Sequence, residues 1–317
     1  MVQCLLVSDL GAAVRTIREA PGLASKRHLD VLGRFGSSVD GDDAAAIPRG
    51  DGFLLVGGEA IWPPLLEADP FAAGAAAAVT SVSDIRAMGG RPVALVDTVV
   101  ARDRGQAERV IDGLAWGADL MGTPVAGGHL TLGGAPSLSV FATGEARVLL
   151  RASAARPGDA LLAAFCLDGE YRGDAPFFSS LRSRSPEALR EDGEALAEVA
   201  EGGLCHAARD VSMPGVAGSL IQLLELAGCG AHLDLDRLPR PGRVALEKWL
   251  VTFPSFGFVL AAPPDRAAEA CAAFTRRGLA CAECGRFTEE RRLTVATGAE
   301  VGVAWDLDAE VLTGLGS

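Results

Sequence analysis

Acidic residues in the first half of the chain stand beside glycines or near the ends of expected helices and strands. They are Asp40, Asp42, Asp43, Glu59, Asp84 and Asp97. Further along, Gly127 and Gly128 precede His129, a potential ligand at the end of an expected glycine turn. Carboxylates are the hard oxygen ligands that Mg²⁺ prefers, and a magnesium site often joins one or two of them to substrate phosphates. Glycines let backbone amides approach the same phosphates. The pattern therefore predicts a site for magnesium and a polyphosphate.

Asp84 is the acid whose position most needs an explanation. The segment DPFAAGAAAAVTSVSDIRAMGG predicts a helix that Asp69 caps and in which Pro70 takes the first position. Gly89 or Gly90 would end it in the left-handed conformation. Asp84 then lies near the negative end of the helix dipole, which costs a few tenths to about 1 kcal/mol. A bound cation would offset that cost.

Each of these residues also has an ordinary structural explanation. An acidic loop such as GDD is most often simply solvated. Asp97 either faces the site or points outward from an edge strand, and His129 is either a ligand or a turn residue whose ring bonds a backbone group. Asp84 is harder to explain in this way, because its neighbours are small and apolar. The GxxxxGK[ST], GxGxxG, GxSxG and HExxH motifs are absent, which excludes a P-loop.

Short strands and helices must position these residues. In the first half the sequence predicts a strand at 44–47, a strand in FLLVG and then the helix that carries Asp84. A buried strand at 93–100 and a helix at 103–121 follow. The segment TPVAGGHLTLGG is expected to form a strand, a glycine turn and a loop. A tight turn at Pro157-Gly158-Asp159 opens a new set of elements. We therefore expect domains at 1–148 and 149–317. Strands and helices mix in both halves, which favours an α+β fold of two domains over one parallel doubly wound sheet.

Composition limits the possible partners. The net charge is −12 and no run of Lys or Arg occurs, which argues against a nucleic-acid partner. No stretch of 18 apolar residues is present and the first residues lack the features of a signal peptide, so we expect no membrane partner and a cytoplasmic location.

Seven cysteines are present, and an odd number in an apparently cytosolic chain argues against a disulfide framework. Cys281 and Cys284 form a single CxxC pair. No second pair or nearby histidine completes a zinc site, so we interpret these two residues as ordinary buried or half-buried thiols. A redox or zinc role is the alternative.

The order of the motifs resembles the aminoimidazole ribonucleotide synthetase (PurM-like) superfamily. The matching segments are GDDAAAI, the strand followed by Glu59, DPFAAGAAAAVTSVSDIRAMGGRPVAL, AGGHLT, and in the second half ARDVSMPGVAGSL, FPSFGFVLAAPP and ECGRFTEERRL. The superfamily includes thiamine-monophosphate kinase, selenophosphate synthetase, a hydrogenase-maturation protein and formylglycinamidine ribonucleotide synthetase. The resemblance covers roughly residues 38–295 in one consistent order.

The resemblance implies two mixed α/β domains, with the amino-terminal domains of two subunits pairing into a β-barrel and ATP bound at the interface of this homodimer. It implies Mg²⁺ ligands at Asp42, Asp43, Asp84 and Glu59, with Asp84 and Asp210 also placed in catalysis. It implies nucleotide contacts at Gly127, Gly128, His129, Asp97 and Ser212. The shared chemistry is ATP-dependent, by phosphoryl transfer to a small metabolite or by phosphate-activated ligation or cyclisation.

The chain also departs from the family pattern. Thiamine-monophosphate kinases usually have Asp where this chain has Glu59 and His129, and the Cys-Gly-x-x-Lys loop of selenophosphate synthetases is missing. In the second half, Met213-Pro214-Gly215 replaces the usual glycine pair. We therefore expect a divergent ATP- and Mg²⁺-dependent kinase or ligase acting on an unidentified small metabolite. The alternative is a nucleotide-binding regulatory or partner subunit that kept the fold and lost catalysis.

Overall fold

The computed structural model describes residues 9–27, 29–38, 41–173 and 175–315, which form two compact units. The five-stranded unit comprises Asp42–Leu150 and Leu181–Gly203, and the seven-stranded unit comprises the described residues within Met1–Gly41, Arg151–Ser180 and Leu204–Ser317. Each unit is therefore assembled from separate segments of the chain. The domain division at residues 148 and 149 remains a proposal.

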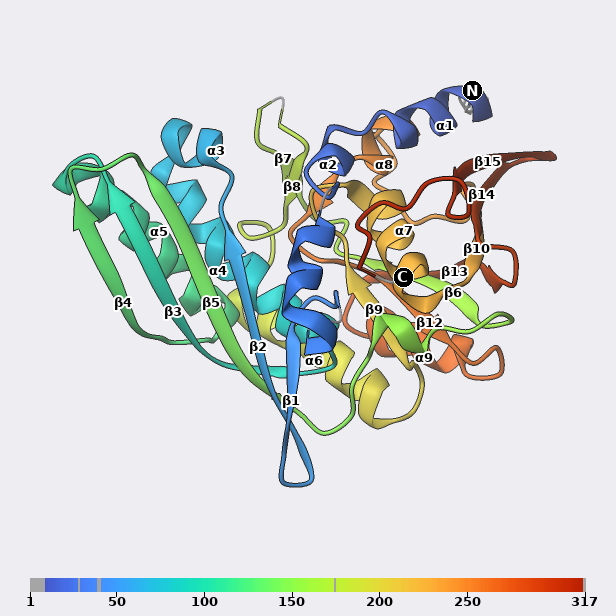
Figure 1. Cartoon of the computed structure of the whole chain (residues 1–317), viewed down its shortest axis with the longest axis horizontal. Coiled ribbons are helices and arrows are strands. Elements are labelled where there is room, and N and C mark those ends of the chain that lie inside the picture. Colours follow the sequence, from blue (N-terminus) through green and yellow to red (C-terminus); the bar gives the residue numbers. More distant parts are fainter. Residues whose placement is uncertain (1–8, 28, 39–40, 174, 316–317) are drawn as a thin grey trace. The chain divides into compact units, whose positions relative to one another are not determined.

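The five-stranded unit is built on one mixed sheet with the strand order β1-β2-β5-β3-β4 (Figure 1). Its strands are β1 (Ala45–Arg49), β2 (Gly52–Ala60), β3 (Arg91–Ala101), β4 (Val125–Leu132) and β5 (Ser137–Ala146). Strand β3 pairs with β5 antiparallel and with β4 parallel. Its helices are α3 (Pro63–Ala68), α4 (Pro70–Ala87), α5 (Arg104–Met121) and α6 (Pro186–Glu201).

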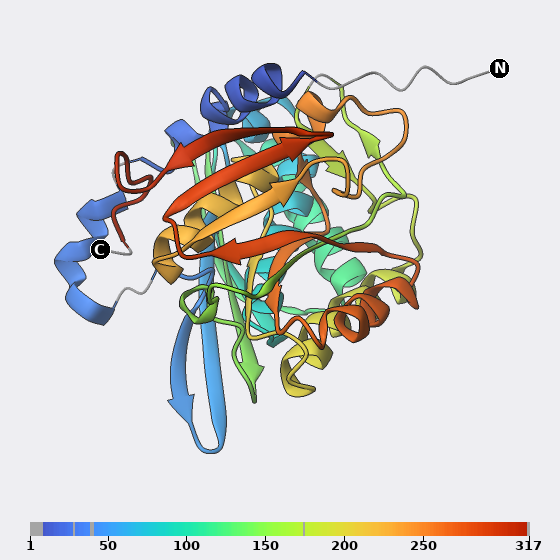
Figure 2. The same cartoon turned by 90° about the vertical axis from the view of Figure 1, so that its right-hand side faces the viewer.

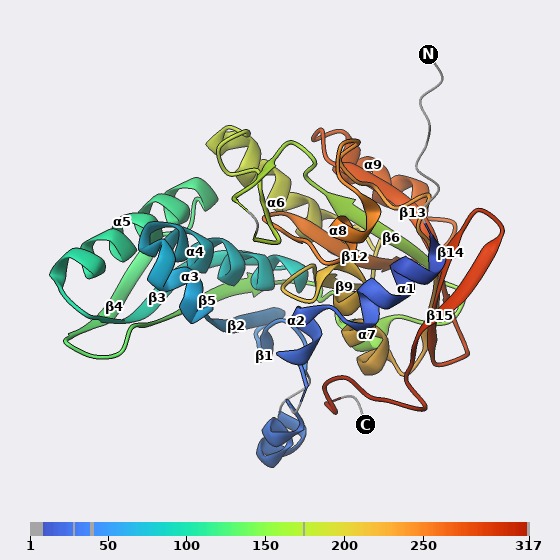
Figure 3. The same ribbon diagram turned by 90° about the horizontal axis from the view of Figure 1, so that it is seen from above.

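Helices α4 and α5 lie side by side against one face of this sheet (Figure 3). Apolar residues of α4 such as Ala77 and Ile85 share a buried core with Leu55 of β2, Leu95 of β3 and Val140 of β5. The cap predicted for α4 is confirmed, because the Asp69 carboxylate accepts a hydrogen bond of 3.0 Å from the Ala72 amide.

Glycines allow α4 and α5 to approach closely. A methyl group added at Gly113 of α5 would collide with the carbonyl oxygen of Phe71, and one added at Gly117 would lie 2.8 Å from the carbonyl oxygen of Ala75. Gly74 of α4 lies in the same way against the Val110 carbonyl. The small residues noted in the sequence therefore serve this helix crossing.

Substituting Gly113 by alanine tests this crossing. Alanine normally stabilises a helix by about 1 kcal/mol relative to glycine, but here the collision with backbone outweighs that gain. We expect the free energy of unfolding to fall by about 1–3 kcal/mol, measured by urea denaturation. Gly105→Ala in the first turn of α5 is the control, because its new methyl group meets only the Asp103 carboxylate at 3.4 Å. Equal stability of the two variants would contradict the close crossing.

Helix α6 is joined to the five-stranded unit by buried and exposed charges. The Arg86 guanidinium lies against Gly193, and burial lowers its pKa to about 10 although Glu194 and Asp192 oppose that shift. Arg91 at the start of β3 donates to Glu194 at 2.9 Å and to Glu201 at 2.6 Å. These pairs explain why a segment from the second half of the chain folds with the first.

The seven-stranded unit has a sheet with the order β15-β14-β10-β13-β6-β12-β9 (Figure 2). Its strands are β6 (Ala160–Phe165), β9 (Ala207–Asp210), β10 (Gly230–Asp234), β12 (Gly257–Ala262), β13 (Ala280–Thr288), β14 (Arg292–Thr297) and β15 (Glu300–Asp306). A second, three-stranded sheet contains β7 (Glu170–Tyr171), β8 (Phe177–Ser179) and β11 (Phe253–Pro254).

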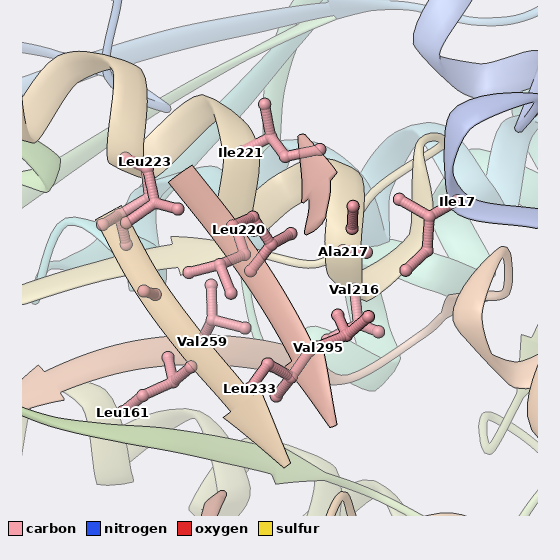
Figure 4. Close-up of a cluster of buried hydrophobic side chains, with 14 of the residues drawn as sticks. Ile17, Leu161, Val216, Ala217, Leu220, Ile221, Leu223, Leu233, Val259 and Val295 are labelled. Atoms are coloured by element: carbon pink, nitrogen blue, oxygen red, sulfur yellow. The ribbon is translucent and has the colours of Figure 1, made fainter. Parts of the chain in front are cut away.

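Helix α7 packs on one face of the seven-stranded sheet. Its residues Val216, Leu220 and Leu223 gather with Leu161 and Val259 in the core (Figure 4). Strands β6 and β12 are buried along their whole length, as expected for central strands covered on both faces. The helices of this unit are α1 (Leu10–Arg18), α2 (Pro21–Ala24), η1 (Leu29–Ser38), η2 (Ala152–Ala154), α7 (Gly215–Ala227), α8 (Leu246–Leu250) and α9 (Ala267–Thr275). Among the helices described, none is long and apolar enough to cross a membrane.

Candidate active site

Asp42 and Asp43 are half-buried and lie just before β1, with Ala44 between them and the strand. The preceding Gly41 has a φ of +76°, a conformation that favours glycine. Within the seven-stranded unit, the Arg209 side chain donates to the Gly41 carbonyl oxygen at 3.2 Å. Asp40 lies outside the described residues.

Asp84 lies in the last turn of α4, as predicted, and is only 5% exposed. The helix ends at Ala87, and Gly89 takes the left-handed conformation with a φ of +77°. Three residues before Asp84, the Ser81 hydroxyl donates to the Val140 carbonyl oxygen at 3.2 Å. This bond holds the end of α4 against the middle of β5.

Gly57 of β2 brings the two predicted acidic segments together. A methyl group added at Gly57 would lie 3.5 Å from the Asp43 carbonyl oxygen and 3.7 Å from the Asp84 Cβ atom. The backbone of the GDD segment and the side chain of Asp84 therefore approach one point on the helix-covered face of the sheet. The same methyl group would lie 3.3 Å from the Ala44 Cβ atom, so the three segments pack closely at this point and glycine permits that approach.

Asp97 lies on β3 in an interior position of the sheet and not on an edge strand. It is 8% exposed and shares a face with the buried residues Leu95 and Val99. Burial raises the pKa of its carboxyl group. Its carboxylate lies over Gly128 of the neighbouring strand, where any side chain would collide with it. The inward orientation is therefore the one that the structure supports.

Glu59 lies in the same row of the sheet as Asp97. Strand register pairs Glu59 with Val140, Val140 with Asp97, and Asp97 with Gly128. Directly opposite residues point to the same face, so both carboxylates project toward the helix-covered side. They stand two strands apart, about 10 Å.

Gly127, Gly128 and His129 do not form the predicted turn. They lie within the continuous strand β4, because parallel pairing with β3 extends from Val125 to Leu132 with one register shift. His129 pairs with Thr98 and therefore faces the side of the sheet opposite to Asp97, where it is exposed. Its Nε2 atom lies 3.3 Å from the Thr131 hydroxyl.

Asp210 and Ser212 belong to the seven-stranded unit. Asp210 ends β9 and is 6% exposed, and the Ser212 amide donates to the Ser219 hydroxyl at 3.1 Å. The hydrogen bond ties the segment after β9 to α7. The roles of both residues near a substrate remain predictions.

The acids of the five-stranded unit fit a magnesium site of the kind that the substrate completes. Within the part of the chain that the structure describes, no three His, Cys, Asp or Glu side chains are arranged as a ready-made metal cage. Mg²⁺ does not need one, since it is commonly held by one or two carboxylates, water and phosphates. The Asp43 backbone and the Asp84 side chain approach each other at Gly57, so acids from the two segments are the candidate oxygen ligands.

Gly57 is the residue of this site that we did not predict. Two signals in the sequence indicate it: its period-two spacing from Leu55 and Glu59, and the presence of glycine within a strand. Glycine in a strand often marks a close approach of another group. The hydrogen bond from Arg209 to Gly41 could not be predicted in this way, because the two residues are far apart in the sequence.

Comparisons with known proteins agree with the order of the motifs. The family model described as AIR synthase related protein, N-terminal domain, matches residues 41–146, and that of the C-terminal domain matches residues 160–298. An uncharacterized protein of Synechocystis sp. is 36% identical over 295 residues, 92% of each chain. A selenide, water dikinase of Myxococcus xanthus is 31% identical over 231 residues, 69% of this chain and 64% of that protein.

Solved structures share the mixed α/β fold. Thermotoga maritima PurL complexed with ADP superposes with a TM-score of 0.72 at 22% identity, over 82% of this chain and 44% of that chain. This chain thus matches less than half of that protein. AaThiL complexed with AMPPCP and TMP superposes with a TM-score of 0.68 at 19% identity, over 87% of this chain and 96% of that chain.

Proposed function

The chain belongs to the AIR synthase-related family, and from that premise we propose that it is an ATP- and Mg²⁺-dependent enzyme acting on a small metabolite. The reaction is phosphoryl transfer to the metabolite, or its ligation or cyclisation after activation by phosphate. The observation that carries the proposal is the close approach of the Asp43 backbone and the Asp84 side chain to each other at Gly57. Relatives that include a selenide, water dikinase and a structure of PurL complexed with ADP support the nucleotide assignment.

In this proposal, Asp42, Asp43, Glu59 and Asp84 hold magnesium. Bound there, Mg²⁺ would neutralise the charge of the phosphate groups and orient them. The protein contributes positioning: Ser81 fixes the end of α4, and the absence of a side chain at Gly57 lets the GDD segment approach Asp84. Such positioning is the main contribution of proteins to phosphoryl transfer, because they do little covalent chemistry of their own in that reaction.

The remaining predicted residues have supporting roles. Asp97, Gly127 and Gly128 would line the nucleotide side, with Gly128 kept small by the Asp97 carboxylate. Asp210 and Ser212 would contact the metabolite. Asp84 and Asp210 are the residues that we propose to act in catalysis.

The second subunit of the proposed homodimer would cover the exposed face of the five-stranded sheet. That face presents apolar side chains that are 36% to 50% exposed in the single chain, namely Ile47, Val56, Val96 and Phe141. Full burial of an exposed apolar side chain contributes about 1.5–3 kcal/mol, so burial of the remaining exposed half contributes about 0.5–1.5 kcal/mol for each side chain. A second copy of this face is therefore a favourable partner.

A regulatory or partner subunit that binds nucleotide without turnover is the second candidate. The observation that favours it is the position of His129, which lies on the exposed face of the sheet and not on the side of Asp97 and Glu59. A histidine oriented in this way does not join the acids within one chain. Catalysis would then be lost while the nucleotide site at Asp84 is retained.

A thermal-shift titration with Mg·ATP tests the nucleotide site. We expect the unfolding midpoint to rise with Mg·ATP and not with ATP and excess EDTA, since a ligand at 100 times its Kd adds about 2.7 kcal/mol. Phosphate release across a panel of metabolites then separates an enzyme from a binding subunit. The same midpoint with Mg·ATP, with ATP and EDTA, and without nucleotide would contradict both candidates.

A further inference from the structure

The CxxC cysteines do not pair with each other. Both lie on β13, where the register shifts between Glu283 and Gly285. Cys284 is fully buried in the core that packs against α7, and its thiol lies 3.5 Å from the Leu161 carbonyl oxygen. Cys281 pairs in register with Ala164 and meets α9 instead.

The partner of Cys281 is Cys271, ten residues earlier on α9. The two Sγ atoms lie 3.5 Å apart, with the Cys281 thiol donating to the Cys271 sulfur. Both residues are half-buried, in contrast to the fully buried Cys284. A disulfide needs a sulfur separation of about 2.05 Å, so a side-chain movement of about 1.5 Å would join them.

The two thiols are suited to different steps of an exchange reaction. The hydrogen bond from Cys281 lowers the pKa of Cys271, which favours the nucleophilic thiolate there. The same bond, together with burial, raises the pKa of Cys281. Burial raises the pKa of Cys205 and of Cys284 to about 12, so these two neighbours stay as unreactive thiols.

We propose that Cys271 and Cys281 are a redox-active pair that forms a reversible disulfide on meeting a small-molecule disulfide such as oxidised glutathione. The Cys271 thiolate attacks one sulfur of glutathione disulfide, forms a mixed disulfide and releases one glutathione thiolate. Cys281 then attacks the Cys271 sulfur, and its proton passes to the second departing glutathione. Two protein thiols are thereby oxidised and one glutathione disulfide is reduced to two thiols.

Mass spectrometry of the folded full-length protein tests the pair. After treatment with oxidised glutathione we expect the intact mass to fall by about 2 Da. After free thiols are then blocked, we expect two fewer blocked cysteines and a cross-linked peptide that joins Cys271 to Cys281. Dithiothreitol should reverse the link. Cys284→Ser is the control. It should keep the link, because Cys284 lies in the core beside α7 and not beside Cys271 of α9.

The two single variants test the order of attack. Cys281→Ser should accumulate a glutathione adduct on Cys271, whereas Cys271→Ser should leave Cys281 largely unmodified. Circular dichroism shows that each variant is folded before it is compared. A native-state link between Cys281 and Cys284, or glutathione adducts on the wild type without any link, would overturn the proposal.

Discussion

Replacing Asp84 by asparagine is expected to weaken the binding of Mg·ATP by at least tenfold, about 1.4 kcal/mol, because a metal-binding carboxylate is lost. Without nucleotide, the helix-dipole contribution to stability alone should favour the variant by up to about 1 kcal/mol. The carboxylate stands at the negative end of the α4 dipole, and asparagine removes that repulsion. Calorimetric titration gives the affinity, and urea unfolding gives the stability.

Asp119→Asn is a matched control for this experiment. Asp119 also lies in the last turn of a long helix, α5, but its side chain is 81% exposed and contacts Arg190 at 3.6 Å. A surface ion pair of this kind contributes little to stability. The control therefore removes the same charge from the same end of a helix, but at a position outside the candidate site. If the two variants bind Mg·ATP equally well, Asp84 does not hold magnesium.

The start and end of helix α4, which carries Asp84, could be predicted from short-range sequence rules. Asp69, Pro70 and Gly89 act through hydrogen bonds and backbone angles within a few residues, so their roles can be read from the sequence. The approach of Asp43 to Asp84 depends on how β1, β2 and α4 pack. No rule of sequence spacing contains that information, and only the glycine at position 57 hinted at it.

Two features of the structure could not be predicted from local sequence rules. The Gly127–His129 segment reads as a turn because glycine pairs usually mark turns, but pairing with β3 keeps it extended as an exposed edge strand. Helix α6 belongs to the five-stranded unit through Arg86 and Arg91, whose partners lie about 100 residues later in the chain. Contacts between such distant residues set the unit to which a segment belongs.

Val96→Glu is expected to convert a homodimer into a monomer. Val96 lies on β3 between Phe141 and Gly127, so its side chain projects from the middle of the exposed sheet face and is 42% exposed. In a dimer through this face, each subunit would bury one new carboxylate among apolar side chains. The cost of about 3 kcal/mol or more raises the dissociation constant at least a hundredfold. Light scattering coupled to size-exclusion chromatography measures the mass.

Val301→Glu is the control, because it makes the same substitution on a strand outside the proposed interface. It shows whether a loss of dimer mass results from the position of the charge or from the substitution itself. Val301 lies on β15 in the seven-stranded unit and is 62% exposed, so the change in charge and strand propensity is matched. The control should keep the wild-type mass. Monomer stability should also be similar in the two variants, because both positions are open to water in the single chain. If Val96→Glu keeps the mass of the wild-type dimer, the second subunit does not cover this face, and a monomeric wild type would exclude the homodimer altogether.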